Sequence, residues 1–342
     1  MKLLIHITPR KTDIKKEKKD SFVDFLTSVR TSARIDGKQR TFHISATIGV
    51  WEIEERPNNI RDVISWPRTA MLNAKNVTHQ AVVYASEDMI EDQSRDNEVL
   101  AEFHAAVENE EFMVFYQPKV DSSTNTLVGA EGLVRWKHDG KMVSPGEFLP
   151  PLERNGEILL LDYYVLQHTC KDISCWIRDG IKPVTVSVNF SRRDLMDREL
   201  AENIVQIIED SGIDKDLIEV EITETVDDAE HGVLTEFINK LYSLGIKTAI
   251  DDFGSGYSSL STLREFEAHT LKIDRSFINT DDFSWKDEVI LTGIISMAKE
   301  LGMSVITEGV EREDQLVFVN NAGCYNIQGF YYDRPLEKEI GR

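Results

Sequence analysis

The feature that most constrains the fold is an alternation of short β-rich runs with longer amphipathic segments from residue 113 onward. The runs cover residues 113–120, 127–134, 184–190, 217–222, 246–250, 270–273, 304–306 and 324–327. Eight strands with interposed helices over about 240 residues predict an α/β fold of the (β/α)8 TIM-barrel type. A doubly wound open sheet is the alternative, but no G-x-G-x-x-G or phosphate-loop glycine pattern is present.

Charge divides the chain near residue 98. Residues 1–98 carry 16 basic and 15 acidic side chains, whereas residues 99–342 carry 23 basic and 45 acidic ones. This difference predicts a domain boundary. The net charge of −21 argues against a nucleic-acid polymer as partner, because binding a phosphate backbone needs a basic surface. It favours a divalent cation instead.

The part before the barrel has its own pattern. Strands are predicted at 2–8, 41–50 and 81–84, and helices at 20–32 and 59–75. Residues 87–110 are charged and periodic, which predicts a connecting helix with one apolar face.

The cysteine count and the hydropathy bear on the compartment. Three cysteines without paired spacing predict neither a disulfide framework nor a zinc site, and they favour reducing surroundings. The most apolar stretch, 158–166, is interrupted by Asp162 and too short to cross a bilayer, and the first residues lack a signal-peptide core. We expect a cytoplasmic chain without membrane contact; a longer, membrane-anchored parent protein is compatible with this.

Polar residues stand at the carboxyl ends of the predicted strands. They are Glu131, Asn189, Glu221, Asp251, Asp252, Lys272, Glu308 and Gln328. In a parallel barrel these ends converge on one mouth, which is where such enzymes carry out their chemistry. Converging carboxylates repel one another unless a cation neutralises them, and an all-oxygen ligand set favours Mg²⁺ or Mn²⁺.

Each of these residues alone has a simpler explanation. An acid after a strand is usually a helix cap or a solvated loop residue. Lys272 could extend its charge to solvent, and Asn189 could close an Asx turn. Seven successive strand ends with a polar group are hard to explain by capping alone, so the pattern favours an active site.

Nine motifs occur in order in this region. They are YQP at 116–118, AEGLVRW at 130–136, SPGEFLPPLE at 144–153, VNFS at 188–191, EITET at 221–225, DDFGSGYSSL at 251–260, LKIDRSFI at 271–278, TEGVE at 307–311 and QGFYYDRPL at 328–336. With these motifs, residues 110–342 resemble the EAL domains, which are cyclic di-GMP phosphodiesterases with a modified (β/α)8 barrel.

The resemblance implies a role for each matching residue. First-metal ligands would be Glu131, Asn189, Glu221 and Asp251. Asp252 would help to bind a second metal, and Glu308 would bind or position that metal and its water. Glu131, Asp252, Lys272 and Glu308 would be the catalytic set, in which Lys272 contacts the attacking water.

Other implied roles concern the substrate. Arg135 would bind a phosphate, Gln117 and Gln328 would complete the site, and Glu224 would brace the loop 253–260. Two divalent ions, Mg²⁺ or Mn²⁺, would activate a water that opens cyclic di-GMP to linear pGpG. Family members commonly form homodimers through the barrel, so a homodimer is expected here.

One position departs from the family pattern. Gly132 follows Glu131 where alanine is usual, and glycine adds backbone freedom worth about 0.5–1 kcal/mol, which could loosen the aim of Glu131. This leaves a second hypothesis, a catalytically inactive EAL domain that acts as a cyclic di-GMP receptor or protein-interaction regulator. A barrel enzyme for a small phosphorylated sugar would fit the fold but not the nine motifs.

The first part of the chain is loosely similar to the C-terminal part of a GGDEF (diguanylate cyclase) domain. The similarity rests on ISATIGVWEI at 44–53 and on the helical pattern at 64–75, and no GGDEF signature is present. The predicted organisation is therefore a partial, degenerate GGDEF-like segment at 1–86, a connecting helix at 87–110 and an EAL domain at 111–342. The first segment is either an incomplete remnant or a fragment of a longer chain.

Overall fold

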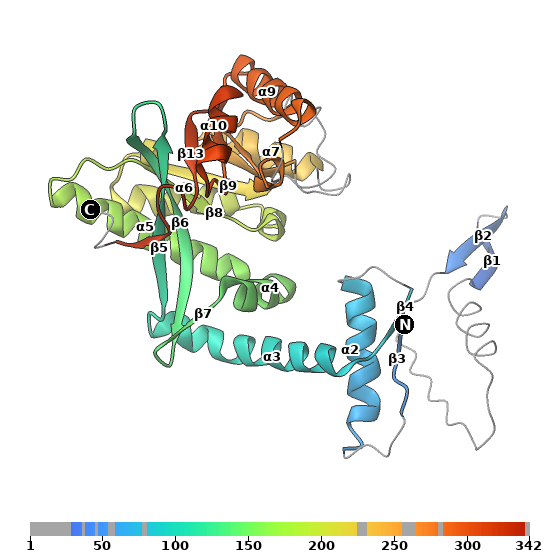
Figure 1. Ribbon diagram of the computed structural model, residues 1–342. Coiled ribbons are helices and arrows are strands. Elements are labelled where there is room, and N and C mark those ends of the chain that lie inside the picture. The colour runs from blue at the N-terminus through green and yellow to red at the C-terminus, as the bar shows by residue number, and fades with distance from the viewer. Residues whose placement is uncertain are drawn as a thin grey trace. The chain divides into compact units, whose positions relative to one another are not determined.

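The computed structural model describes residues 29–35, 38–44, 47–53, 59–76, 81–223, 231–254, 265–279 and 283–338. The chain divides into two compact units, Met1–Glu98 and Val99–Arg342 (Figure 1).

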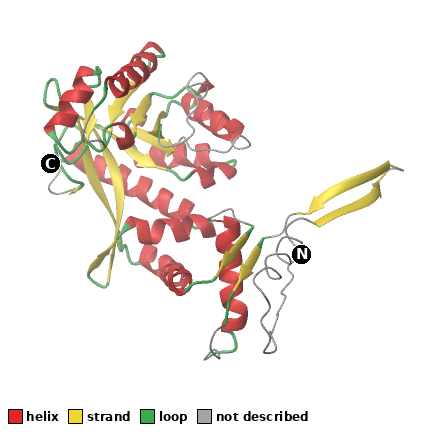
Figure 2. Cartoon of the chain, turned by 45° about the vertical axis from the view of Figure 1, so that its right-hand side comes forward, coloured by secondary structure: helices red, strands yellow, loops and turns green. Residues whose placement is uncertain are grey.

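In the residues of the first unit that the structure describes, the strands form two small sheets. β1 (Val29–Ile35) pairs antiparallel with β2 (Lys38–Ile44), and β3 (Ile48–Val50) pairs in parallel with β4 (Val82–Tyr84). The helix α2 (Asp62–Asn76) lies beside the β3–β4 pair (Figure 2).

The predictions for this unit were partly wrong. The helix predicted at 20–32 is wrong for residues 29–32, which belong to β1, and its other residues lie outside the described ones. The strand predicted at 41–50 is divided between β2 and β3. The helix prediction overlooked a local signal for a hairpin: the sequence Asp36-Gly37, which is typical of two-residue turns, stands between Ile35 of β1 and its partner Lys38 of β2. The predicted helix at 59–75 and strand at 81–84 are confirmed as α2 and β4, and the strand predicted at 2–8 lies outside the described residues.

The predicted connecting helix is α3 (Glu87–Glu108), which crosses the division at Glu98. Its last turns bury Phe103 and Ala106 in an aromatic cluster with Phe112, Trp136 and Phe148. The apolar face predicted from the periodicity is therefore buried, within the second unit, over the last turns of the helix.

The second unit is built on a closed eight-stranded barrel. Its strands are β5 (Phe112–Asp121), β6 (Thr126–His138), β8 (Thr185–Asn189), β9 (Ile218–Thr223), β10 (Lys247–Phe253), β11 (Thr270–Ile273), β12 (Ser304–Thr307) and β13 (Asn326–Gln328). They pair in this order, and β5 closes the barrel by pairing with both β13 and β6. Two short strands extend its edge: β7 (Lys141–Val143) pairs with β6, and β14 (Leu336–Glu337) pairs with β5.

The barrel departs from a regular (β/α)8 barrel at its first strand. β5 runs antiparallel to both of its neighbours, whereas the other seven strands are parallel. Only residues 122–125 separate β5 from β6, and a parallel connection needs a dozen or more residues. The expectation that every run is followed by a helix was therefore wrong for the first run.

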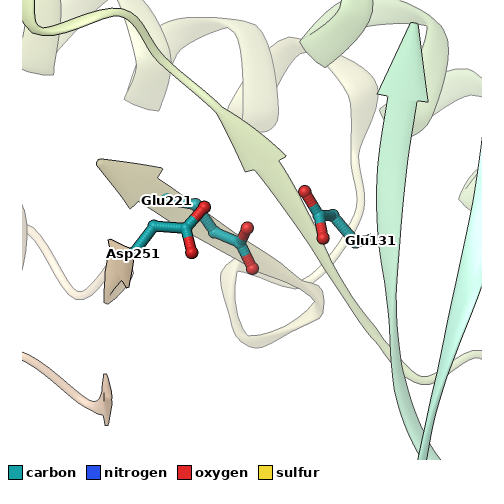
Figure 3. A group of neighbouring side chains, drawn as sticks. All are labelled: Glu131, Glu221 and Asp251. Atoms are coloured by element: carbon teal, nitrogen blue, oxygen red, sulfur yellow. The ribbon is translucent and has the colours of Figure 1, made fainter. Parts of the chain in front are cut away.

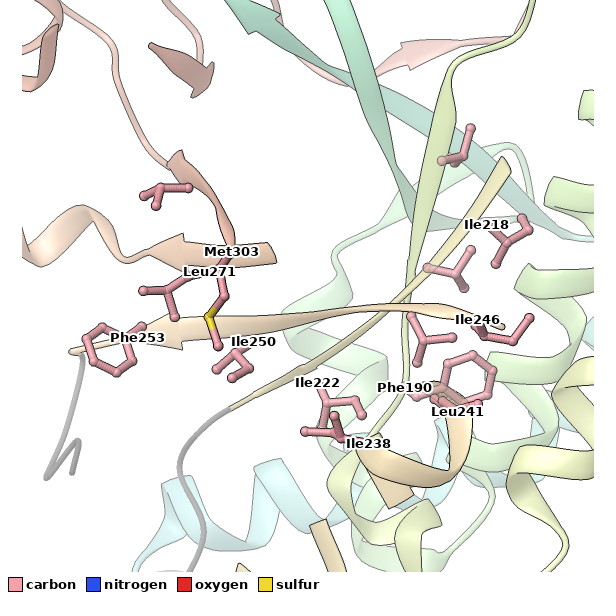
Figure 4. Close-up of a cluster of buried hydrophobic side chains, with 14 of the residues drawn as sticks. Phe190, Ile218, Ile222, Ile238, Leu241, Ile246, Ile250, Phe253, Leu271 and Met303 are labelled. Atoms are coloured by element: carbon pink, nitrogen blue, oxygen red, sulfur yellow. The ribbon is translucent and has the colours of Figure 1, made fainter. Parts of the chain in front are cut away.

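Helices cover the parallel strands. They are α4 (Pro145–Asn155), α5 (Ile158–Arg178), α6 (Leu200–Ser211), α7 (His231–Ser243), α9 (Trp285–Glu300) and α10 (Glu313–Asn321). The strand side chains that face these helices, such as Ile218, Ile222 and Leu271, form one buried apolar cluster (Figure 4). Alternate residues of the strands point into the barrel, where Lys119, Ser187, Glu219, Glu221, Thr270 and Lys272 contact one another. In the part of the chain that the structure describes, no helix is both long and apolar enough to cross a membrane.

Candidate active site

The polar strand ends meet at one mouth of the barrel. Glu131 lies on β6, Glu221 on β9 and Asp251 on β10, and their carboxylates face one another across the opening (Figure 3). Glu131 and Asp251 are only 6% and 8% exposed to solvent, and Glu221 is completely buried. Convergence of these residues, expected from the sequence pattern, is what the structure shows.

Lys272 lies at the centre of the cluster. Its Nζ is 2.6 Å from Glu308 Oε1, 3.2 Å from Asp251 Oδ2 and 3.3 Å from Glu131 Oε2, and it also contacts Glu221. Burial alone would lower the pKa of Lys272, but the carboxylates outweigh it and raise the pKa well above the usual lysine value. Lys272 is thus a permanent positive charge inside the barrel, not a side chain that extends to solvent.

Two amide side chains support Glu131. Asn189 Nδ2 donates to Glu131 Oε1 at 2.7 Å, and Gln328 Nε2 donates to Glu131 Oε2 at 2.5 Å. Gln328 Nε2 also lies 3.4 Å from Gln117 Oε1 on β5. All three residues that the sequence placed near Glu131 are therefore in contact with it or with each other.

Among the described residues, two groups of carboxylates have the geometry of cation sites. Glu131, Glu221 and Asp251 form one, and Asp251, Asp252 and Glu308 form the other. In each group one oxygen per residue lies within 4.8 Å of the others. Since the donors are all oxygen atoms and Asp251 belongs to both groups, the residues fit two neighbouring Mg²⁺ or Mn²⁺ ions better than zinc or copper.

Asp252 has an unusual backbone. Its φ of 54° lies in the left-handed region, which is uncommon for residues other than glycine, and its N–H donates to Asp251 Oδ1 at 2.8 Å. This conformation turns the chain sharply, so that two consecutive aspartates of β10 both belong to the second carboxylate group. Strain of this kind is common at functional sites.

The carboxylates outnumber the lysines, and the pKa values reflect this. Burial raises the pKa of Glu308 to about 8, although Lys272 opposes the shift. Burial also acts on Glu221, but there Lys119 and Lys272 outweigh it and hold the pKa at about 2. Burial therefore favours the protonated form of Glu308, whereas the two lysines favour the ionised form of Glu221.

Arg135 lies apart from the carboxylates. It is four residues beyond Glu131 on the same side of β6, about 13 Å along the strand. Its Nη1 donates to the Val134 carbonyl oxygen at 2.8 Å, and its guanidinium lies 5.7 Å from the centre of the Phe115 ring. The side chain is partly exposed, so it can meet a ligand that enters from the mouth.

Gly132 is closely surrounded. A Cβ at this position would lie 3.3 Å from Val114 Cγ1 and 3.4 Å from the Ser187 carbonyl oxygen. The residue is paired with Tyr116 on one side and Val188 on the other. The sheet therefore restrains the backbone at Gly132, and the loosening expected from glycine is small.

The remaining predictions for the site differ in outcome. Glu224 and most of the loop 253–260 lie outside the described residues. The sequence interpretation missed Lys119, which contacts Glu221, and Ser187, which contacts Lys119. The period of two in a strand could have found them, because Lys119 shares a face with Gln117 and Ser187 shares one with Asn189.

A family model described as EAL domain matches residues 100–335. Among curated proteins, the chain is 29% identical over 297 residues to MucR of Pseudomonas aeruginosa, described as a bifunctional diguanylate cyclase/cyclic di-GMP phosphodiesterase. It is 36% identical over 237 residues to the signaling protein YkoW of Bacillus subtilis. These matches cover 86% and 68% of this chain but only 43% and 29% of the two relatives, so the chain spans less than half of either.

Solved structures give the same result. The PaMucR phosphodiesterase in complex with cyclic di-GMP matches with a TM-score of 0.66 and 31% identity, over 72% of this chain and all of that one. An EAL domain protein from Listeria monocytogenes matches with a TM-score of 0.62 and 29% identity, over 70% of this chain and 94% of that one.

Proposed function

This chain belongs to the EAL domain family, and on that premise we propose that it is a metal-dependent phosphodiesterase that hydrolyses cyclic di-GMP to linear pGpG. The observation that carries the proposal is the pair of carboxylate groups around Lys272, which share Asp251. The similarity to a phosphodiesterase structure that contains cyclic di-GMP supports the choice of substrate.

The proposed division of work starts with the cations. Glu131, Asn189, Glu221 and Asp251 would hold the first Mg²⁺ or Mn²⁺, and Asp251, Asp252 and Glu308 the second. When bound, two such ions lower the pKa of a water molecule and offset charge on a phosphate.

Lys272 is suited to orient the attacking water. It is fixed by carboxylates from four strands or strand ends, and its ammonium group can only donate hydrogen bonds. Such a group holds the water through its oxygen and leaves the water's proton free for a carboxylate. Glu308, whose Oε1 lies 2.6 Å from Lys272 Nζ, is the proposed acceptor of that proton in its ionised form.

The substrate residues are proposed to act around this centre. Arg135, farther out on β6, would offset the charge of a phosphate, and a planar guanidinium can bind two of its oxygens at once. Gln117 and Gln328 would form the wall of the site opposite Asp251 and would keep Glu131 aimed at the cation. The attack would break the bond to the ribose 3′ oxygen and leave the linear dinucleotide.

The test is to incubate the purified chain with cyclic di-GMP and Mg²⁺ or Mn²⁺, with a chelator control, and to separate the nucleotides. Metal-dependent pGpG would support the enzyme. Tight binding without turnover would instead favour the receptor hypothesis. A Glu131→Gln variant should form no pGpG, and activity in that variant would point to a contaminating phosphodiesterase.

We further propose that the chain forms a homodimer through α9. Trp285 and Val289 are 70% and 61% exposed on one face of this helix, and Gly293 follows two turns after Trp285 with open space beside it. An apolar, uncharged stripe that ends in a small residue suits close packing with an identical helix.

We also propose an identity for the first unit and a cellular location for the chain. The match to MucR covers 86% of the chain, which is more than the second unit contains, so it extends into the first unit. This supports a partial, degenerate GGDEF-like segment at 1–86, before the helix at 87–110 and the EAL domain at 111–342. A cytoplasmic location is proposed from the reduced cysteines and the substrate.

A further inference from the structure

We infer that Lys119 is a positioning residue that holds Glu221 from beneath the metal site and thereby sets the affinity of the site for its cations; this inference rests on the proposed function. Lys119 is only 3% exposed and belongs to none of the ligand groups. It is the second buried lysine of the barrel, one layer below Lys272.

The reversed direction of β5 gives Lys119 this place. Gln117 pairs with Glu131 in the ligand layer, and Lys119 pairs with Gly129, two residues deeper. Because β5 runs antiparallel to β6, residues later in β5 lie farther from the mouth. The side chain of Lys119 then extends across the barrel axis under Glu221.

Gly129 provides the space for this side chain. A Cβ at position 129 would lie 3.4 Å from Lys119 Cδ, 3.7 Å from its Cβ and 3.2 Å from the Thr185 carbonyl oxygen. The aliphatic part of the lysine therefore packs on the bare backbone of β6, and its path is defined by packing as well as by charge.

The ammonium group of Lys119 has three oxygen partners. Its Nζ lies 2.7 Å from Glu221 Oε1 and 3.6 Å from Glu219 Oε2, and it contacts Ser187 Oγ. Two of these oxygens, Ser187 Oγ on β8 and Glu221 Oε1 on β9, accept hydrogen bonds from the ammonium group, and Glu219 adds a longer ion pair. These contacts fix the position of the charge.

Glu221 is held on both oxygens as a result. Lys119 binds Oε1, and Lys272 contacts Oε2. Lys272 is shared with three other carboxylates that would bind cations, whereas Lys119 touches none of them. With cations bound to these carboxylates, Lys119 would still hold Glu221 through Oε1 and leave Oε2 available as a ligand. Residues that orient a metal ligand in this way typically change metal affinity 10- to 100-fold.

A purely structural role is the alternative, since Lys119 also balances the buried Glu219. Glu219 has its own second partner, because Thr270 Oγ1 donates to Glu219 Oε1 at 2.6 Å. Glu219→Gln keeps this acceptor and removes the charge. The double variant Lys119→Met/Glu219→Gln therefore removes one positive and one negative buried charge together, and leaves Glu221 without its lower partner.

The experiment measures Mn²⁺ binding to the full chain by the electron paramagnetic resonance signal of the free ion, with no nucleotide present. We expect the dissociation constant to rise at least about 10-fold in Lys119→Met and in the double variant. Glu219→Gln is the matched control and should stay within about threefold of the wild type. Thermal unfolding of each variant checks the fold, and if Lys119→Met does not fold, the charge-balanced double variant decides.

Recovery of wild-type Mn²⁺ affinity in the double variant would overturn the inference, because it would assign Lys119 to the balance of Glu219 alone. A wild-type chain that binds no Mn²⁺ would overturn it together with the proposed metal site. A wild-type chain that binds Mn²⁺ but yields no pGpG would contradict the phosphodiesterase only. In that case the loss of Mn²⁺ affinity in the double variant would still support the role of Lys119.

Discussion

At the scale of single residues, buried lysines make this acidic barrel possible. The mouth brings together five carboxylates that would repel one another in a low-dielectric interior. Lys272 is 1% exposed and lies among four of them. Its side chain therefore stabilises the metal-free fold as well as serving the proposed chemistry.

Replacing Lys272 by Met should separate these two roles. Removing one partner of a buried ion pair leaves uncompensated charge, so the metal-free chain should lose about 3–5 kcal/mol of unfolding free energy. Loss of the group that orients the water should lower the rate of pGpG formation at least about 100-fold. Urea unfolding with a chelator and a turnover assay would measure both. Lys240→Met, at a surface pair with Glu202, is the control and should cost no more than about 1 kcal/mol. A metal-free Lys272→Met chain as stable as the wild type would contradict this account.

Gly132 permits a second prediction at this scale. Alanine would restrict the unfolded chain, but its methyl would press on Val114 Cγ1 at 3.3 Å. These opposing effects should leave the unfolding free energy of Gly132→Ala within about 1 kcal/mol of the wild type. Because the sheet already holds the backbone, the rate of pGpG formation should change less than about threefold. A large gain in rate in the nucleotide assay would mean that glycine does loosen Glu131.

At the scale of elements, the end of α3 is joined to β6 by a titratable contact. Glu111, just after the helix, lies 2.8 Å from His138 Nδ1 and accepts from Trp136 Nε1 at 3.1 Å. Glu102 of α3 lies 3.2 Å from His138 Nε2. The hydrogen bond to Glu111 raises the pKa of His138, and the same bond lowers the pKa of Glu111.

The direction of these shifts sets a pH window. The raised pKa of His138 stabilises the fold at pH values below the unfolded pKa near 6.5. This stabilisation is lost as the pH rises through the pKa of the folded state. The lowered pKa of Glu111 stabilises the fold at pH values above its unfolded pKa of about 4.5. This stabilisation is lost as the pH falls through the pKa of the folded state. The contact should therefore be strongest near pH 5–6. His138→Gln should lower the urea midpoint at pH 6 and have less effect at pH 8, and an equal effect at both values would show that His138 is not charged in the fold.

At the scale of the whole molecule, the proposed homodimer depends on the exposed face of α9. Val289→Glu would place a charge in the centre of this stripe, where burial in a dimer would desolvate it. We expect the variant to sediment as a monomer at concentrations at which the wild type sediments as a dimer. Val317→Glu on α10 is the control, since Val317 is 51% exposed on another helix and should leave the dimer intact. A wild-type chain that sediments as a monomer at all accessible concentrations would rule the dimer out.

The sequence by itself determined the barrel and most of its site. Eight β-rich runs predicted eight strands, and the polar residues at their ends, among them Glu131, Glu221 and Asp251, do converge. Hydrophobic alternation and strand length are local properties, so they can be read from neighbouring residues. In the first unit the same method mistook β1 for a helix, because the polar residues around it lack a clear period.

Only the tertiary structure decided how strands and charges combine. The pairing of β5 with both β6 and β13 closes the barrel and places Lys119 under Glu221, 102 residues away in sequence. Whether a strand lysine reaches solvent or lies in a barrel depends on long-range pairing, which no local pattern encodes. The same holds for Glu308, whose pKa is raised only because folding buries it beside other carboxylates. Period and propensity act over a few residues, whereas the register of a closed barrel is set by all of its strands together.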